Sequence, residues 1–197
     1  MQTIHTLVDL AKVKIGLTVV EALTQAGYSA VLAGGAARDL CHGKSCKDID
    51  VIVVPNEITP EGYSNLCQWL DSYGFVQKDG ITDYEFGEGM TCRILGVFEQ
   101  TTRVGEIDVV IYNPLEFTTA IDCVKTGFDV NMNQYVIDNV VGESILTQYH
   151  GDSVSELALK RMRLIRNDIS DTRRARLIEV AKELGWNYDC LVEKTML

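Results

Sequence analysis

The stretch Leu32-Ala-Gly-Gly-Ala-Ala-Arg-Asp-Leu40, followed after a short loop by Lys47-Asp-Ile-Asp-Val-Ile-Val-Val54, decides the fold. The apolar residues before the glycines and the run that contains Asp48 and Asp50 both predict strands, because they are short, rich in apolar residues and bounded by turn residues or proline. Side chains two apart on a strand point to the same face, so the two aspartates share one. Buried charges are costly unless they are paired or bind a metal ion. The pair therefore indicates a functional site.

A second run, Gly105-Glu-Ile-Asp-Val-Val-Ile-Tyr-Asn113, repeats this pattern and places Glu106 and Asp108 on one face of another predicted strand. Mg2+ is typically held by one or two carboxylates together with substrate phosphates, and two such ions can clamp a phosphoryl displacement. The sequence thus predicts a site for two Mg2+ ions, with Asp48, Asp50 and either Glu106 or Asp108 as ligands. The alternative is that these carboxylates merely solvate strand edges.

The glycines add a second half to this site. Gly34 and Gly35 end the first strand, and Arg38 falls in the first turn of the helix predicted after them. A glycine-rich turn from strand to helix lets backbone N–H groups approach an anion, with the positive end of a helix behind them. The two halves together describe a site for a metal–nucleoside triphosphate.

These residues resemble a known motif. Gly34-Gly-x-x-Arg-Asp39 followed by Asp48-x-Asp50 resembles the motif of the polymerase β-like nucleotidyltransferases, most closely the class II CCA-adding tRNA nucleotidyltransferases and bacterial poly(A) polymerases. Two later segments are similar to motifs of that family in the same order. They are Phe128-Asp-Val-Asn-Met-Asn-Gln-Tyr135 and Glu156-Leu-Ala-Leu-Lys-Arg-Met-Arg-Leu-Ile-Arg166, the latter matching a helix that contacts the incoming base.

The resemblance implies an enzyme that moves a nucleoside monophosphate from an NTP such as ATP to a hydroxyl and releases pyrophosphate. It implies an RNA 3′ end, as in tRNA processing, as the acceptor. It also favours Asp108 over Glu106 as the third carboxylate. We expect Asp39 to be a structural partner, either of Arg38 or of a backbone N–H, rather than a metal ligand. The catalytic and metal-binding candidates are Asp48, Asp50 and Asp108, and the nucleotide-binding candidates are Gly34, Gly35, Arg38, Lys125, Asn131, Lys160 and Arg163. Asn131 has a second interpretation, as the brace of a loop.

Departures from the family pattern bear on specificity. Lys125-Thr-Gly127 stands where the family has Arg-Arg-Asp, and Leu157 and Lys160 replace an Asp and an Arg that pair with the base. Lysine lacks the planar fork of arginine, so we expect looser nucleotide choice than in a CCA-adding enzyme. Two alternatives stay open. One is transfer to a protein or small-molecule hydroxyl, and the other is a non-catalytic nucleotide-binding module.

Length and periodicity predict an α/β (α+β) protein, with a mixed sheet flanked by helices and a short helical tail. The 197 residues fit a catalytic domain over 1–150 and a helical extension over 151–197. The predicted helices span 3–26, 36–42, 60–72, 114–124, 154–167 and 171–184. The predicted strands span 29–33, 48–54, 75–78, 91–99 and 104–112, with a loop at 79–90 and an ambiguous segment at 128–138.

Net charge, hydropathy and cysteine content narrow the class of protein. The net charge of −10 argues against a protein that coats nucleic acid, yet eight of the 18 basic residues fall between Lys160 and Lys182 and could contact phosphates. Without a secretory signal layout or an apolar run of about 18 residues, we expect a cytoplasmic protein with no membrane span. The six cysteines have no disulfide-framework spacing, and Cys41, His42 and Cys46 lack the second pair of a zinc site. No pattern indicates the oligomeric state.

Overall fold

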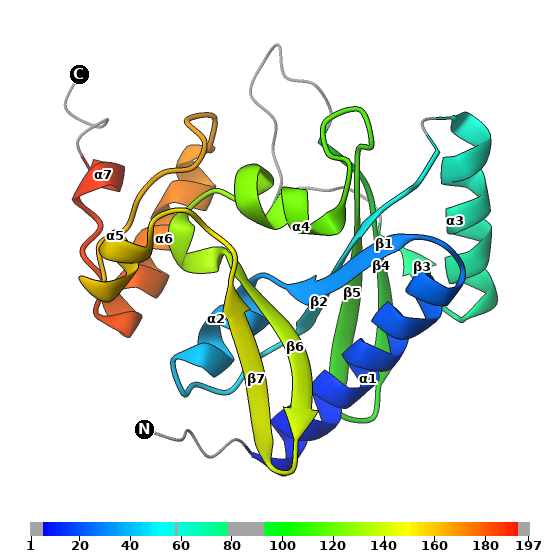
Figure 1. The fold of residues 1–197 in the computed structure, drawn as a ribbon, viewed down its shortest axis with the longest axis horizontal. Helices are drawn as coiled ribbons and strands as arrows, with labels where there is room; N and C mark the ends of the chain where they lie inside the picture. The colour runs from blue at the N-terminus through cyan, green and yellow to red at the C-terminus, as the bar shows by residue number, and fades with distance from the viewer. Residues whose placement is uncertain (1–5, 58, 79–92, 193–197) are drawn as a thin grey trace.

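A seven-stranded mixed sheet forms the centre of the computed structural model, which describes residues 6–57, 59–78 and 93–192 (Figure 1). The strands are β1 (Ser29–Ala33), β2 (Ile49–Val54), β3 (Val76–Gln77), β4 (Ile94–Thr102), β5 (Gly105–Tyr112), β6 (Tyr135–Val141) and β7 (Ser144–Tyr149). Their order across the sheet is β3-β4-β5-β2-β1-β6-β7. The pair β2–β5 is parallel, whereas the other five pairs of neighbours are antiparallel.

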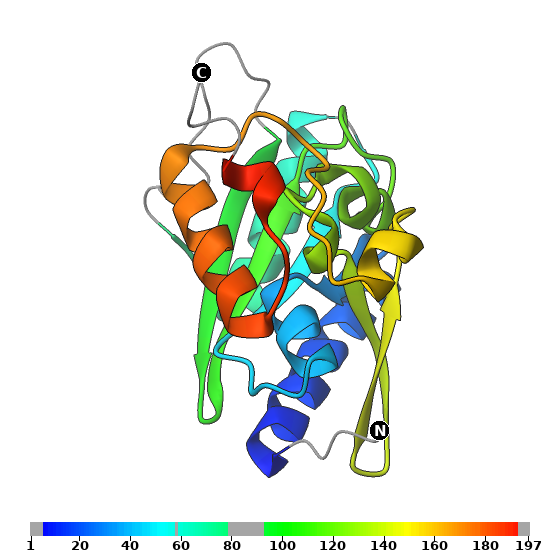
Figure 2. The same ribbon diagram turned by 90° about the vertical axis from the view of Figure 1, so that its left-hand side faces the viewer.

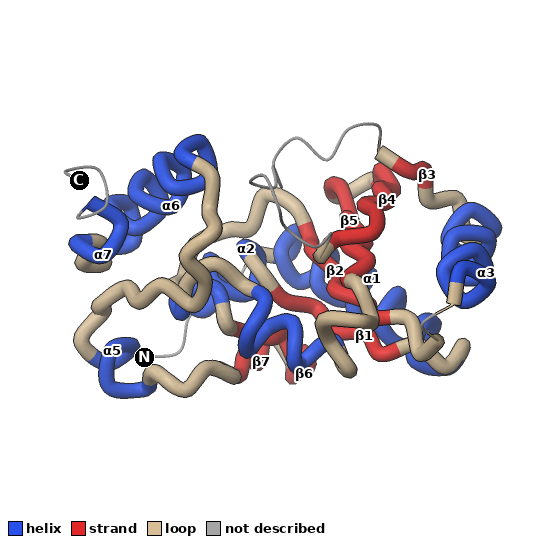
Figure 3. The backbone as a smooth tube through the Cα atoms, turned by 90° about the horizontal axis from the view of Figure 1, so that it is seen from above, coloured by secondary structure: helices blue, strands red, loops and turns tan. Residues whose placement is uncertain are grey.

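Helices cover the sheet unevenly. They are α1 (Leu7–Gln25), α2 (Gly35–Cys41), α3 (Pro60–Ser72), α4 (Ala120–Asp122), α5 (Val154–Ala158), α6 (Asp171–Leu184) and α7 (Asp189–Val192). Figure 3 shows α3 at one end of the molecule and α5, α6 and α7 at the other, and Figure 2 views the molecule from the end that carries α6 and α7. Among the described residues, no helix is long and apolar enough to cross a membrane.

The alternation of side chains along β2 and β5 divides the core between the two faces of the sheet. Val51 and Val53 belong to a buried cluster that includes residues of α1 and α3, whereas Ile52 and Val54 pack in a second cluster with α4. Asp50 has the same parity as Ile52 and therefore shares the α4 face. Asp50 therefore lies on the same face as the second cluster, just beyond its buried apolar residues.

Most predicted elements are present, including the strands at 29–33, 48–54 and 104–112 and the helices at 60–72 and 171–184. The mixed sheet flanked by helices is confirmed. The predicted loop at 79–90 lies outside the described residues, as do the first residues of the predicted helix at 3–26 and strand at 91–99. The ambiguous segment forms a 3₁₀ turn (Asn131–Asn133) and the start of β6, which pairs with β7, a strand that the sequence did not predict.

The helix predicted at 114–124 is wrong in its first half. Residues after Tyr112 turn around Asn113, whose side chain accepts a hydrogen bond from the Leu115 N–H. The helix begins only after Thr119, which forms a reciprocal capping box with Asp122, and it continues as a π-helical turn to Gly127. Capping at Thr119 satisfies the N–H groups of the first turn and so determines where the helix begins.

The helix predicted at 154–167 is also wrong, because it ends at Ala158. Lys160 adopts a left-handed conformation with φ 49°, which interrupts the helix. The chain then pairs as an extended segment, through bridges from Arg161 to Asn187 and from Leu164 to Val130. Long-range backbone pairing therefore replaces the local helical pattern in this segment.

The C-terminal part has an apolar cluster of its own. Its buried members are Val130, Met132, Met162, Leu177, Ala181, Leu184, Trp186 and Leu191. Two of them precede residue 150, so the cluster joins the tail to the segment before β6. The division into domains at residues 150 and 151 stays a prediction.

Candidate active site

The acidic residues lie side by side on one face of the sheet. Asp50 on β2 is in register with Asp108 on β5, and Asp108 is in register with Glu99 on β4. Asp48 comes two residues before Asp50, and Glu106 two residues before Asp108. Strand register therefore places the predicted carboxylates together, although they are about 60 residues apart in the sequence.

Asp48, Asp50, Glu106 and Asp108 line a cavity of about 430 Å³. That volume is within the range typical of small-molecule sites. One wall consists of the sheet carboxylates with the Gly34-Gly35 turn, Arg38 and Asp39 beside them. The other wall consists of Asp129 and part of the C-terminal segment, namely Arg166, Asp168, Ile169, Ser170, Arg173, Arg176, Leu177 and Val180. Both Glu106 and Asp108 reach the cavity, so the structure does not choose between them as the third carboxylate.

Asp50 is the most perturbed carboxylate of the group. Burial, followed by the neighbouring charges of Asp108 and Asp48, raises the pKa of Asp50 to about 6. A hydrogen bond from the Gly35 backbone opposes this shift in part. A raised carboxyl pKa means that the negative charge lacks compensation, which is what a cation would supply.

Asp108 faces a lysine. The Lys78 Nζ lies 2.9 Å from Asp108 Oδ1 and donates a hydrogen bond of 2.9 Å to Oδ2. Lys78 also forms a 2.9 Å ion pair with Glu99. Desolvation lowers the pKa of Lys78, but its hydrogen bonds to Asp108 and Glu99 outweigh this and raise the pKa above its ordinary value. Asp108 Oδ1 is buried and accepts no hydrogen bond from the described residues, despite its short distance to Lys78.

The donor set fits a hard divalent cation. Within residues 6–57, 59–78 and 93–192, no group of three His, Cys, Asp or Glu side chains is already arranged around a metal position. Mg2+ does not need one, because it usually takes one or two carboxylates and completes its shell with water and phosphate oxygens. Asp48 and Asp50 supply two carboxylates, and the raised pKa of Asp50 is consistent with a cation beside them.

Steric constraints explain why a glycine is needed at position 34. Gly34 has φ +83°, and a Cβ atom at this position would lie 3.0 Å from Asp50 Oδ2. Only glycine adopts this conformation without strain, and any side chain would press on the carboxylate. The turn therefore brings backbone and carboxylate into contact at the edge of the cavity.

Arg38 is held in place by two partners. Its Nε pairs with Asp39 Oδ1 at 2.7 Å, and its Nη1 donates to Asn133 Oδ1 at 2.9 Å. Asp39 is thus the structural partner that the sequence predicted. Asn133 lines the same cavity and was not predicted, because nothing in the local sequence links it to Arg38, 95 residues earlier.

Four predicted nucleotide-binding residues do not line the cavity: Lys125, Asn131, Lys160 and Arg163. Asn131 braces the extended segment, because its side chain accepts from the Arg163 N–H and donates to the Arg161 carbonyl. The Lys160 Nζ donates to the carbonyl of Leu184. This geometry does not support nucleotide contacts by these four residues. Leu157 lies outside the cavity as well. The presence of Leu157 and Lys160 in place of the family's Asp and Arg therefore gives no basis for inferring nucleotide choice.

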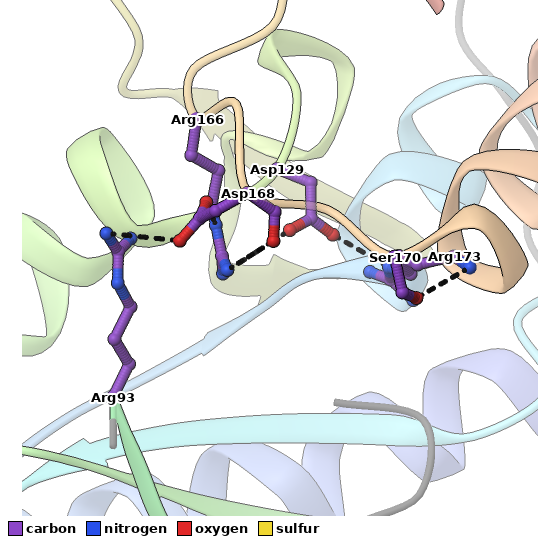
Figure 4. A network of polar contacts seen from close by, with 6 residues as sticks. All are labelled: Arg93, Asp129, Arg166, Asp168, Ser170 and Arg173. Atoms are coloured by element: carbon purple, nitrogen blue, oxygen red, sulfur yellow. Dashed lines mark hydrogen bonds and ion pairs between the residues drawn. The ribbon is translucent and has the colours of Figure 1, made fainter. Parts of the chain in front are cut away.

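Other arginines belong to the wall that contains Asp129, and Figure 4 shows their ion pairs. Arg166 pairs with Asp168 at 2.6 Å and with Asp129 at 3.6 Å, and Arg173 pairs with Asp129 at 2.7 Å. Arg93, which directly precedes β4, reaches Asp168 at 3.6 Å. The basic tract that begins at Lys160 could have indicated Arg166, Arg173 and Arg176 as cavity residues. The helix wrongly predicted at 154–167 instead led to the selection of Lys160 and Arg163.

The comparisons with known proteins support the fold. No family model matches the chain, and no curated protein matches it. Two solved structures described as a tRNA-processing enzyme superimpose with TM-scores of 0.54 and 0.55, at 18% and 17% identity, over 89% and 92% of this chain. A CCA-adding enzyme in complex with CTP matches 78% of this chain at 15% identity, with a TM-score of 0.47. This chain spans 46%, 44% and 33% of those three proteins. The resemblance inferred from the motifs is therefore confirmed as a likeness of fold.

Proposed function

We propose that this protein is a metal-dependent nucleotidyltransferase that moves a nucleoside monophosphate from an NTP to a hydroxyl group. The observation that carries the proposal is the register of Asp50 and Asp108 at the base of a cavity whose edge is the Gly34-Gly35 turn. Acidic groups for a metal ion and backbone groups for phosphates lie in one space of about 430 Å³. The fold shared with tRNA-processing enzymes is consistent with this chemistry but does not establish it.

The residues have distinct parts in this reaction. Asp48 and Asp50 would hold Mg2+, with Asp108 as the third ligand and Glu106 as its alternative. When bound, Mg2+ supplies positive charge that activates the acceptor hydroxyl and offsets the charge of the triphosphate. Gly34, Gly35 and Arg38 would hold the β- and γ-phosphates. The acceptor oxygen would then bond to the α-phosphorus, with its proton passing to water, while the bond to the pyrophosphate leaving group breaks.

The fixed geometry of Arg38 suits this role. Because Asp39 and Asn133 already orient its guanidinium, little side-chain freedom is lost when a phosphate binds. Positioning and charge stabilisation dominate the rate in phosphoryl transfer, so a prearranged cation is an advantage. Arg166, Arg173 and Arg176 on the opposite wall are the candidates for contacts with the rest of the nucleotide or with the acceptor.

An RNA 3′ end is the acceptor that the likeness to tRNA-processing enzymes favours. The net charge of −10 favours a second candidate, a hydroxyl on a protein or small molecule, because a long polyanion would be repelled by much of the surface. Incubation with Mg2+ and each α-labelled NTP, offered total RNA, tRNA lacking its 3′ CCA and a protein lysate in turn, separates the two. Label in none of the pools, with Asp50→Ala as the blank, would contradict the proposal.

A further inference from the structure

The carboxylate row extends one strand further than the predicted metal ligands. Asp50, Asp108 and Glu99 occupy matched positions on three adjacent strands. Neighbouring strands are about 4.8 Å apart, and like charges directly opposite one another destabilise a sheet. Such a row therefore needs positive charge in order to be stable.

Lys78 supplies this charge at one end of the row. It follows β3, and its backbone N–H donates to the Val97 carbonyl at 2.9 Å, which fixes the residue beside β4. From there its ammonium lies 2.9 Å from Glu99 Oε2 and 2.9 Å from Asp108 Oδ1. Lys78 thus bridges Glu99, at one end of the row, and Asp108, in its middle.

Asp48, two residues before Asp50 at the other end of the row, is paired differently. Asp48 pairs with Lys47 at a longer distance of 3.4 Å, and the Lys47 side chain is 89% exposed, compared with 33% for Lys78. An exposed pair of this kind is worth little, because water competes for both charges. Asp48 can accordingly bind a metal ion with little loss of ion-pair energy, whereas Asp108 is already paired with a partly buried cation, Lys78.

We propose that Lys78 is an internal counter-cation for Asp108, and that a divalent metal ion gains Asp108 as a ligand only by displacing the Lys78 ammonium. The inference rests on the proposed function, since it takes the carboxylate row as the metal site. Glu99 makes the exchange feasible, because Lys78 keeps this second partner when it leaves Asp108. Lys78 is therefore a positioning residue, which sets how tightly the metal binds before the nucleotide arrives.

The test measures metal binding directly. Mn2+ affinity of the nucleotide-free protein, followed by electron paramagnetic resonance of the free ion, is compared between wild type and Lys78→Met. The variant should bind Mn2+ about fivefold more tightly or better, since the metal no longer displaces an ion pair. The matched control is Lys47→Met, which removes the exposed lysine next to Asp48 and should change the affinity less than twofold.

A double mutant separates displacement from general charge repulsion. In an Asp108→Asn background, Lys78→Met should have no effect on Mn2+ affinity, because the contested ligand is gone. Near-UV circular dichroism verifies folding, and Lys78→Gln replaces Lys78→Met if the latter is unfolded. Unchanged or weaker affinity in the folded variant, or the same tightening in the Asp108→Asn background, would overturn the inference.

Failure of the proposed function gives a different result. In that case wild-type protein binds no Mn2+, or binds it with equal affinity when Asp50 is replaced by Asn, and both proposals fall together. If binding depends on Asp50 but not on Lys78, only the present inference fails.

Discussion

The two walls of the cavity hold their charges in different ways. On the sheet, Asp50 and Asp108 lie in register on neighbouring strands, so backbone hydrogen bonds set their separation. On the opposite wall, Asp129, Arg166 and Asp168 come from irregular segments and are held by side-chain ion pairs of 2.6–3.6 Å. A rigid sheet suits the reacting centre, where small displacements are costly. The paired arginines can exchange partners and suit the recognition of a ligand.

The largest expected effect is on the sheet side. Asp48→Ala or Asp50→Ala should reduce nucleotidyl transfer on the order of 10³-fold, because metal-based charge stabilisation contributes several kcal/mol. The measurement is incorporation of α-labelled NTP at saturating Mg2+, with circular dichroism to verify that the fold is intact. Activity within a few-fold of wild type in either folded variant would remove these residues from the metal site.

Neutralising the anchor of the opposite wall should have a smaller effect of another kind. Asp129→Asn breaks the ion pairs to Arg166 and Arg173, so both guanidinium groups lose a partner that orients them. We expect the KM for the NTP or the acceptor to rise about tenfold, with kcat changed only a few-fold, as for a loss of uniform binding. Steady-state kinetics with each substrate varied in turn measures the two constants.

The matched controls for this wall are Lys160→Ala and Arg163→Ala. Both remove cations from the same basic tract, but neither side chain lines the cavity. Their KM values should stay within about twofold of wild type. A tenfold rise in KM for either control, with Asp129→Asn unaffected, would favour the assignment made from sequence over the one made from the structure.

The same contrast explains what the sequence could predict. The period of two along a strand was enough to place Asp48 with Asp50 and Glu106 with Asp108. The glycines and Arg38 follow from a local turn. The C-terminal wall depends on pairings between distant residues, such as Asn131 with Arg163 and Arg166 with Asp129. A helical pattern at 154–167 could not reveal that extended pairing would replace the helix.

Asp50→Asn tests the charge on the sheet through stability. The folded pKa of Asp50 is about 6, above its ordinary value of 3.8, so ionisation destabilises the native state at neutral pH. The contribution of Asp50 to stability should therefore rise as the pH falls from about 7 to 4, and its penalty at pH 7.5 is at most about 3 kcal/mol. In EDTA, Asp50→Asn should melt about 3–9 °C higher than wild type at pH 7.5 and show little difference at pH 4.

Metal sharpens this prediction. Mg2+ with a non-hydrolysable NTP should raise the melting temperature of wild type and have less effect on Asp50→Asn. Glu143→Gln is the control, because it removes an exposed carboxylate between β6 and β7 that does not line the cavity. Equal melting temperatures for wild type and Asp50→Asn at both pH values would show that the aspartates do not share a site.

The smallest expected effect concerns the contact between the tail and α2. The Trp186 Nε1 lies 3.1 Å from His42 Nε2, and His42 Nδ1 lies 2.8 Å from the Arg38 carbonyl. Tryptophan can only donate, so His42 Nε2 accepts and its proton is on Nδ1, which donates to Arg38. These two hydrogen bonds connect the tail to the helix that carries Arg38.

Trp186→Phe keeps most of the buried ring and removes one hydrogen bond, so we expect a loss of about 1 kcal/mol in the free energy of unfolding. Urea denaturation measures this loss, and KM should stay within about twofold, because Arg38 is still held by Asp39 and Asn133. A large rise in KM with unchanged stability would instead mean that the tail positions Arg38, and that the two walls are mechanically coupled.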